Sequence, residues 1–151
     1  MESSALVLAG AVDWVQPAWR GHFYPEGLPD DWLLSYYNTQ FGAVYLTAER
    51  WGSVSAATWT QWLADTQAGF HFVLENAPRA SSMPASGRVL VADAAWEAKH
   101  VWWLDAQPDL RALAARITQH AARAEPLFVF SRSGDLAQLE KVNSLKQVMG
   151  Y

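Results

Sequence analysis

Acidic side chains that follow short apolar segments are the residues of this sequence best suited to chemistry. The candidates for catalysis are Glu49, Glu75, Asp93 and Asp105. Because parallel strands end at one edge of a sheet, acids that follow them can meet there. Two carboxylates about 5 to 10 Å apart could then act as the acid and the base of a glycosidase-like reaction. Acids after strands also cap helices, which is the structural alternative at each position.

The segment Ser131-Arg132-Ser133-Gly134 is a candidate for anion binding. It follows the last expected strand and opens the last expected helix, where backbone N–H groups and the helix dipole favour negative charge. The guanidinium and the two hydroxyl groups would add charge and hydrogen bonds. No glycine-rich nucleotide motif accompanies the segment, so a small anion or an anionic metabolite is the expected ligand, and a capped turn is the alternative.

The composition indicates no metal, no cofactor and no nucleic-acid partner. The chain has no cysteine, which excludes disulfides, thiolate catalysis and cysteine-ligated zinc. The four histidines lack the H-x-x-x-H spacing of a zinc site. The formal net charge is −4, and residues 1–78 carry two Arg against eight Asp and Glu. Phosphate-backbone binding needs a clustered basic surface, which this distribution does not provide.

The length and the N-terminal sequence predict a single domain, residues 1–151, without a membrane segment. With 51% hydrophobic residues, a chain of this length can bury a substantial core. The apolar run ALVLAGAV has no basic residue before it and is too short for a signal-peptide core or a membrane span. It is interpreted as a buried strand, and a cytoplasmic location is expected.

Short apolar segments predict six strands that are covered on both faces, as in parallel sheets. They lie at residues 5–9, 43–47, 70–74, 88–92, 101–104 and 127–130. Helices are expected to begin near Asp30, Ser55 and Asp109, and a last helix to span about 135–149. The order β-α-β-α-β, a stretch rich in Ser, Pro, Ala and Gly at 80–87, and then β-β-α-β-α predicts an α/β domain.

The stretch WRGHFYPEGLP, residues 19–29, is expected to leave the first strand as a packed loop. Trp19 and Tyr24 should be largely buried, in contact with Trp14 or with the end of the next strand. Lining a pocket is the second expected use of this region. The residues expected to line it are Asp13, Trp14, Trp19, Tyr24 and Tyr45.

Parts of this pattern resemble the YecE-like family, domain of unknown function 72. The matching N-terminal positions are Gly10, Trp14, Trp19, Arg20, Gly21, FYPEGLP at 23–29, Tyr36, Tyr37, Phe41 and Val44. The likeness continues to Arg79, and the C-terminal segment FVFSRSGDLAQLEKVNSLKQVMG also resembles the end of that family. The resemblance implies a TIM barrel, which needs about 250 residues. The chain is therefore expected to be a reduced or incomplete TIM-barrel-like domain of about six mostly parallel strands with flanking helices, its middle deleted near 80–87.

Departures from the family pattern fall at the expected strand ends, where barrel enzymes place catalytic groups. Val44-Tyr45-Leu46-Thr47 stands where the family tends to have Val-Glu-Ile-Asn, and Glu75 stands where it often has Lys. These changes favour a non-catalytic or degenerate binding or interaction module with an aromatic-lined face. The alternative is a small metal-independent hydrolase or lyase acting on a phosphorylated or sugar-like metabolite. Because a barrel without its middle exposes strand edges, a homodimer is predicted unless segments of the same chain cover them.

Overall fold

The strands of the protein all run parallel. The computed structural model describes residues 6–77 and 84–151. The strands are β1 (Val7–Ala11), β2 (Ala43–Leu46), β3 (His71–Glu75), β4 (Val89–Ala92), β5 (Val101–Trp103) and β6 (Leu127–Ser131). They form two three-stranded sheets, ordered β1-β6-β5 and β2-β3-β4, and every strand pairing is parallel. The parallel α/β class predicted from the sequence is confirmed.

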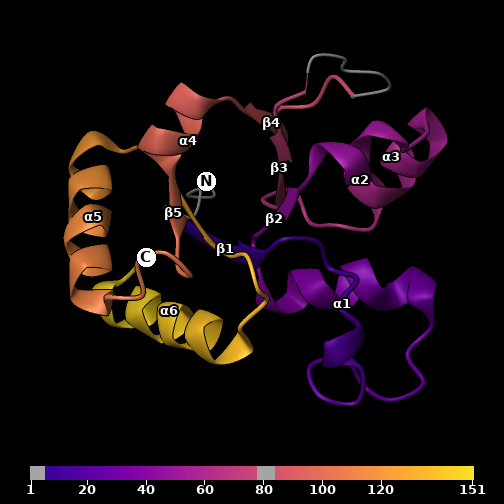
Figure 1. Cartoon of the computed structure of the whole chain (residues 1–151), viewed down its shortest axis with the longest axis horizontal. Coiled ribbons are helices and arrows are strands. Elements are labelled where there is room, and N and C mark those ends of the chain that lie inside the picture. Colours follow the sequence, from indigo (N-terminus) through magenta and orange to yellow (C-terminus); the bar gives the residue numbers. More distant parts are fainter. Residues whose placement is uncertain (1–5, 78–83) are drawn as a thin grey trace.

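Helices surround these strands (Figure 1). They are α1 (Leu33–Gln40), α2 (Ala48–Gly52), α3 (Ala56–Ala64), α4 (Ala94–His100), α5 (Leu110–Arg123) and α6 (Leu136–Met149). The side chains of Ser55, Asp109 and Asp135 accept hydrogen bonds from backbone N–H groups at the starts of α3, α5 and α6, as predicted. A 3-10 turn, Asp30–Trp32, comes before α1, so that helix begins three residues later than expected.

The two sheets meet between β1 and β2. The Gly42 N–H donates a hydrogen bond to the Ala9 carbonyl at 3.2 Å, and the Asp13 N–H donates one to the Tyr45 carbonyl at 2.9 Å. Val12 and Tyr45 form an isolated parallel bridge. The strands therefore follow one another in the order β5-β6-β1-β2-β3-β4.

A tyrosine hydroxyl completes this junction. Tyr37 of α1 is fully buried, and its hydroxyl accepts a hydrogen bond from the Ala11 N–H at 2.8 Å and donates one to the Ala43 carbonyl at 2.7 Å. The hydroxyl thus bridges an N–H group of β1 and a carbonyl group of β2. The absence of a side chain on Gly10 leaves the room for this contact.

Replacing Tyr37 with phenylalanine is expected to destabilise the protein by about 1 to 3 kcal/mol, because it removes two hydrogen bonds to buried backbone groups. The melting temperature should fall by roughly 5 °C in a calorimetric scan. Tyr36→Phe is the control, because Tyr36 is half-buried and its hydroxyl has no hydrogen-bond partner among the described residues. Equal melting of wild type and Tyr37→Phe would show that the bridge contributes nothing.

The strands do not close into a barrel. In the described part of the chain no ladder joins β4 to β5, so the TIM-barrel-like arrangement predicted from the family resemblance is not confirmed. The deletion expected near 80–87 falls partly on residues 78–83, which lie outside the described residues. In Figure 1, α4 lies between β4 and β5.

Helix α4 corrects the predicted order of elements, which placed β5 directly after β4. The Asp93 carboxylate caps the helix by accepting a hydrogen bond from the Trp96 N–H at 2.8 Å. Ala94, Ala95 and Lys99 then supply strong helix formers. The Trp96 ring lies 5.5 Å from that of Phe128 on β6, so α4 covers the inner face of the curved strand array.

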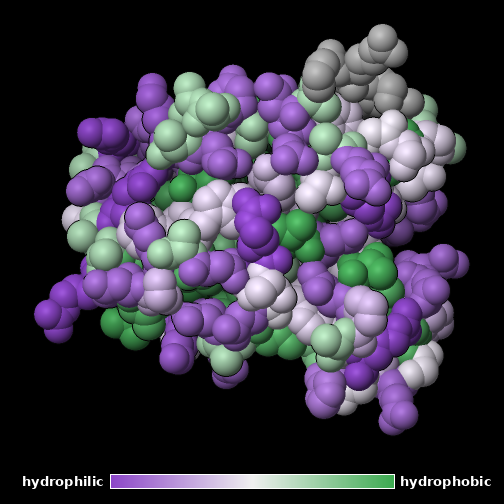
Figure 2. Space-filling view, viewed as in Figure 1, coloured by the Kyte–Doolittle hydropathy of each residue, from purple (hydrophilic) through white to green (hydrophobic). Residues whose placement is uncertain are grey.

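The strands separate two cores. The larger one lies between the strands and the outer helices, and the smaller one lies on the inner face. The buried residues of the smaller core are Leu8, Ala43, Tyr45, Val73, Ala92, Val101, Phe128 and Phe130. On the face seen in Figure 2, hydrophobic residues form small, separate areas among hydrophilic side chains. A broad apolar interface is not indicated on this face, and the homodimer stays a prediction.

Candidate functional site

The loop WRGHFYPEGLP is packed as predicted. Trp19 is 3% exposed and Tyr24 is 1% exposed. The Tyr24 hydroxyl donates a hydrogen bond to the Trp14 carbonyl at 2.5 Å, and the Trp19 indole N–H donates one to the Gly134 carbonyl at 3.2 Å. The prediction that both side chains are buried, with a contact to Trp14, is confirmed. Both rings belong to the larger core.

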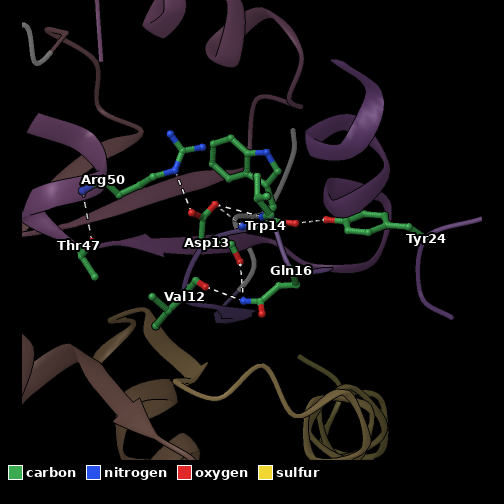
Figure 3. Close-up of polar contacts among 8 residues, drawn as sticks. Val12, Asp13, Trp14, Gln16, Tyr24, Thr47 and Arg50 are labelled. Atoms are coloured by element: carbon green, nitrogen blue, oxygen red, sulfur yellow. Dashed lines mark hydrogen bonds and ion pairs between the residues drawn. The ribbon is translucent and has the colours of Figure 1, made fainter. Parts of the chain in front are cut away.

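Asp13 follows β1 in an unusual backbone conformation. Its φ angle is 67°, in the left-handed region that favours glycine. The carboxylate stabilises this turn, because one oxygen accepts hydrogen bonds from the backbone N–H groups of Trp14 at 2.7 Å and Val15 at 3.1 Å. The other oxygen accepts a hydrogen bond from Nε of Arg50 at 2.8 Å (Figure 3). Asp13 therefore connects the end of β1 to α2.

Arg50 lies against two tryptophan rings. Its guanidinium carbon is 5.2 Å from the ring centroid of Trp14 and 5.1 Å from that of Trp62 on α3. The two rings also contact each other edge to face at 4.7 Å. Both distances fall within the range of a cation–π interaction. Arg50, paired with Asp13, therefore lies against an aromatic wall formed by Trp14 and Trp62.

This wall forms one side of an open groove of about 1040 Å³. The opposite side comes from the 3-10 turn and α1. The lining includes Trp14, Asp31, Trp32, Tyr36, Arg50, Trp62 and Asp65. Trp32 is 62% exposed, whereas Trp14 is 4% exposed. Of the residues expected to line a pocket, Trp14 borders the groove and Asp13 holds the Arg50 that borders it.

The predicted anion-binding turn already holds a carboxylate from the same chain. Asp105 accepts hydrogen bonds from the backbone N–H of Arg132, from the backbone N–H of Ser133 at 3.2 Å and from the Ser133 hydroxyl at 2.7 Å. Burial alone would raise the pKa of Asp105, but these hydrogen bonds outweigh it and lower the pKa below the ordinary value for aspartate. Gly134 completes the turn with a φ angle of 72°.

The side chains of the other candidate acids lie at the starts of helices. The Glu75 carboxylate accepts a hydrogen bond from the Ala48 N–H, the first residue of α2, at 2.8 Å. Asp93 caps α4, and Glu49 is exposed in the first turn of α2. In the described ranges, no two of the four predicted acids share a hydrogen-bond donor.

The inner face carries a carboxylate that the sequence analysis did not identify. The Tyr45 hydroxyl lies 3.4 Å from a carboxylate oxygen of Glu97 on α4, and the Tyr45 ring contacts the rings of Trp103 and Phe130. Burial raises the pKa of Tyr45, and the negative charges of Glu97 and Glu75 raise it further, so the hydroxyl stays protonated. Asp93 is a residue type that often caps helices, so a helix beginning there could have been predicted. That helix carries Glu97 near the strands.

The Arg132 guanidinium takes part in this inner cluster. Its central carbon lies 4.1 Å from the ring centroid of Trp103, within cation–π range. The backbone of Arg132 thus binds Asp105, while its side chain covers an aromatic ring. Over residues 6–77 and 84–151, no group of three or more His, Asp or Glu side chains is arranged to hold a metal ion.

Comparison with known proteins gives one result. The family model described as protein of unknown function DUF72 matches residues 8–98, more than half of the chain. The matched part runs from β1 through most of α4, and the C-terminal block that resembles the family lies outside it. No curated protein and no solved structure matches the chain. Within the described residues, no helix combines the length and the apolar character needed to cross a membrane.

Proposed function

We propose that this chain, which belongs to the DUF72 family of proteins of unknown function, acts as a non-catalytic ligand-binding module. The groove between α1 and α3 is its binding site. The observation that carries this proposal is the ordered aromatic wall of Trp14 and Trp62, fixed by the Asp13–Arg50 ion pair beside an open volume of about 1040 Å³.

The wall supports ligand binding because it is organised before any ligand arrives. Trp14 is held by its contact with Trp62 and by the hydrogen bond from Tyr24 to its carbonyl. A site whose side chains are already fixed loses little conformational entropy on binding. Trp32 lies in the same groove and is the only exposed one of the nine tryptophans, all of which the structure describes. An exposed indole offers a surface on which a flat or apolar group can stack.

A small metal-independent hydrolase or lyase is the alternative, and it has less support. Such an enzyme needs two carboxylates that can act on one substrate at an open site. Glu75, Asp93 and Asp105 each accept backbone hydrogen bonds at the start of a helix or in a turn. These contacts favour capping roles, so we assign no reaction to the strand ends.

Thermal shift measurements test the groove as the binding site. The probes are glucose, glucose 6-phosphate, phenethyl alcohol, phenethylamine and 3-phenylpropionate. At one hundred times its dissociation constant, a bound probe should raise the melting temperature by about 5 to 10 °C. We expect at least one probe to do so with the wild type and to lose the effect with Trp32→Ala.

Tyr151→Ala is the matched control, because it removes another exposed aromatic ring at the C-terminus, outside the groove. This variant should keep the full shift. A shift that persists in Trp32→Ala, or the failure of all five probes, would contradict the proposal.

A further inference from the structure

We infer that the groove between α1 and α3 takes a small organic cation, an amine or guanidinium compound with an adjoining apolar part. This inference rests on the proposed function, since it assigns a ligand class to the same groove. It depends on the charges of the groove and on the aromatic rings that stay accessible in it.

The charged side chains of the groove leave an excess of negative charge. Among the described residues that line the groove, three carboxylates, from Asp30, Asp31 and Asp65, stand against one guanidinium, that of Arg50. Arg50 forms its ion pair with Asp13, and Asp30 forms one with Arg20. The cation in the wall is therefore already neutralised by a residue of the chain.

Two carboxylates of the groove have no cationic partner in the part of the chain that the structure describes. Among the described residues, neither Asp31 nor Asp65 takes part in an ion pair. One Asp65 oxygen accepts a hydrogen bond from the Gln61 amide at 2.8 Å, which leaves its negative charge in place. The groove therefore complements a positive charge and repels a negative one.

The aromatic residues of the groove favour the same class of ligand. Arg50 already lies against the rings of Trp14 and Trp62, so the indole left open to a ligand cation is that of Trp32. Trp32 stays 62% exposed and lies next in sequence to Asp31. A ligand whose apolar part covers Trp32 could thus bring its ammonium group near a carboxylate. Cation–π attraction would add to that ion pair.

The charge of the surrounding chain acts in the same direction. Residues 1–78, which contain all the described residues that line the groove, carry two Arg against eight Asp and Glu. Such an excess attracts cations over distances comparable to the Debye length, about 10 Å at 0.1 M salt. The affinity for a cation should therefore fall as salt is added.

Titration calorimetry with three probes of similar size and different charge tests the inference. Phenethylamine, phenethyl alcohol and 3-phenylpropionate share a phenyl ring on a short chain and are positive, neutral and negative at pH 7. We expect phenethylamine to bind the full chain at least about tenfold more tightly than 3-phenylpropionate at low salt, with phenethyl alcohol between them. Raising the salt to 0.5 M should reduce the difference.

Asp31→Asn and Asp65→Asn should each weaken phenethylamine binding about threefold and leave phenethyl alcohol unchanged. Asp31 is exposed, so its variant keeps the test valid if Asp65→Asn folds poorly. Glu140→Gln removes one negative charge from α6, outside the groove, and should change neither affinity.

The possible results distinguish an error in the class of ligand from an error in the location of the binding site. If 3-phenylpropionate binds as tightly as phenethylamine and Trp32→Ala abolishes its binding, the cation inference is wrong and the groove remains the binding site. If phenethylamine binds equally well to Trp32→Ala and to both Asp variants, the groove is not its site, and both proposals fail.

Discussion

Gly10→Ala is expected to be among the most destabilising single substitutions in this chain, with a cost of about 3 to 5 kcal/mol. A methyl group on Gly10 would overlap the Ala43 carbonyl oxygen and the Tyr37 hydroxyl oxygen, and it would lie 2.8 Å from the Ala43 carbonyl carbon. Two of these atoms belong to the backbone, and the third ends the fully buried side chain of Tyr37, which has little room to move. The substitution therefore has to push β1 away from β2 and break the hydrogen bonds of Tyr37.

Urea unfolding of Gly10→Ala measures this cost. Gly69→Ala is the control, because no atom of the described residues other than its chain neighbours lies within 4 Å of the added methyl group. Its unfolding midpoint should stay close to that of the wild type. If Gly10→Ala unfolds at the wild-type midpoint, the close approach of β1 and β2 is not a constraint on stability.

A double substitution separates the two parts of the Gly10 effect. In the Tyr37→Phe background the hydroxyl is absent, so the added methyl group meets only the Ala43 carbonyl. Gly10→Ala should therefore cost less in that background than in the wild type. A coupling free energy of about 1 kcal/mol or more is expected for residues in direct contact. Additive costs would mean that the Tyr37 hydroxyl and Gly10 act independently.

The strands could be predicted because each of them is short, apolar and buried on both faces. All six expected strands are present, with ends shifted by up to two residues. The starts of three helices followed from Ser55, Asp109 and Asp135, because a capping side chain acts on the next few backbone N–H groups. Such local signals need no knowledge of the fold.

Contacts between distant segments were not predictable in the same way. The Tyr37 hydroxyl acts between Ala11 and Ala43, and nothing in the sequence near Tyr37 indicates this. Arg50 and Trp62 lie on different helices, and they meet Trp14 only because the strands bring α2 and α3 beside the end of β1. The groove therefore became visible only in the folded chain.

The candidate acids show why residue type alone was insufficient. Asp93 was expected at a strand end and is found there, but its carboxylate caps α4. The same holds for Asp105, which the turn after β6 binds through two backbone N–H groups. A carboxylate after a strand serves either chemistry or capping, and the geometry of the next few residues decides between them.

Trp19→Ala is the second substitution with a large expected effect, about 3 to 5 kcal/mol. The indole is 3% exposed, stacks near the Tyr37 ring at 6.2 Å and contacts the rings of Phe23 and Tyr24. Its N–H group also donates a hydrogen bond to the Gly134 carbonyl, 115 residues away in the sequence. Truncation would leave a large cavity and would separate the loop after β1 from the turn before α6.

The melting temperature of Trp19→Ala should fall by roughly 10 °C or more. Trp19→Phe keeps most of the ring and loses the hydrogen bond, so it should cost clearly less than Trp19→Ala. Trp32→Ala removes the same side chain from an exposed position and should change stability by only about 0.5 kcal/mol. If Trp19→Ala melts like the wild type, Trp19 does not hold the loop after β1 against the turn before α6. The aromatic residues of the loop would then need an explanation other than packing in the core.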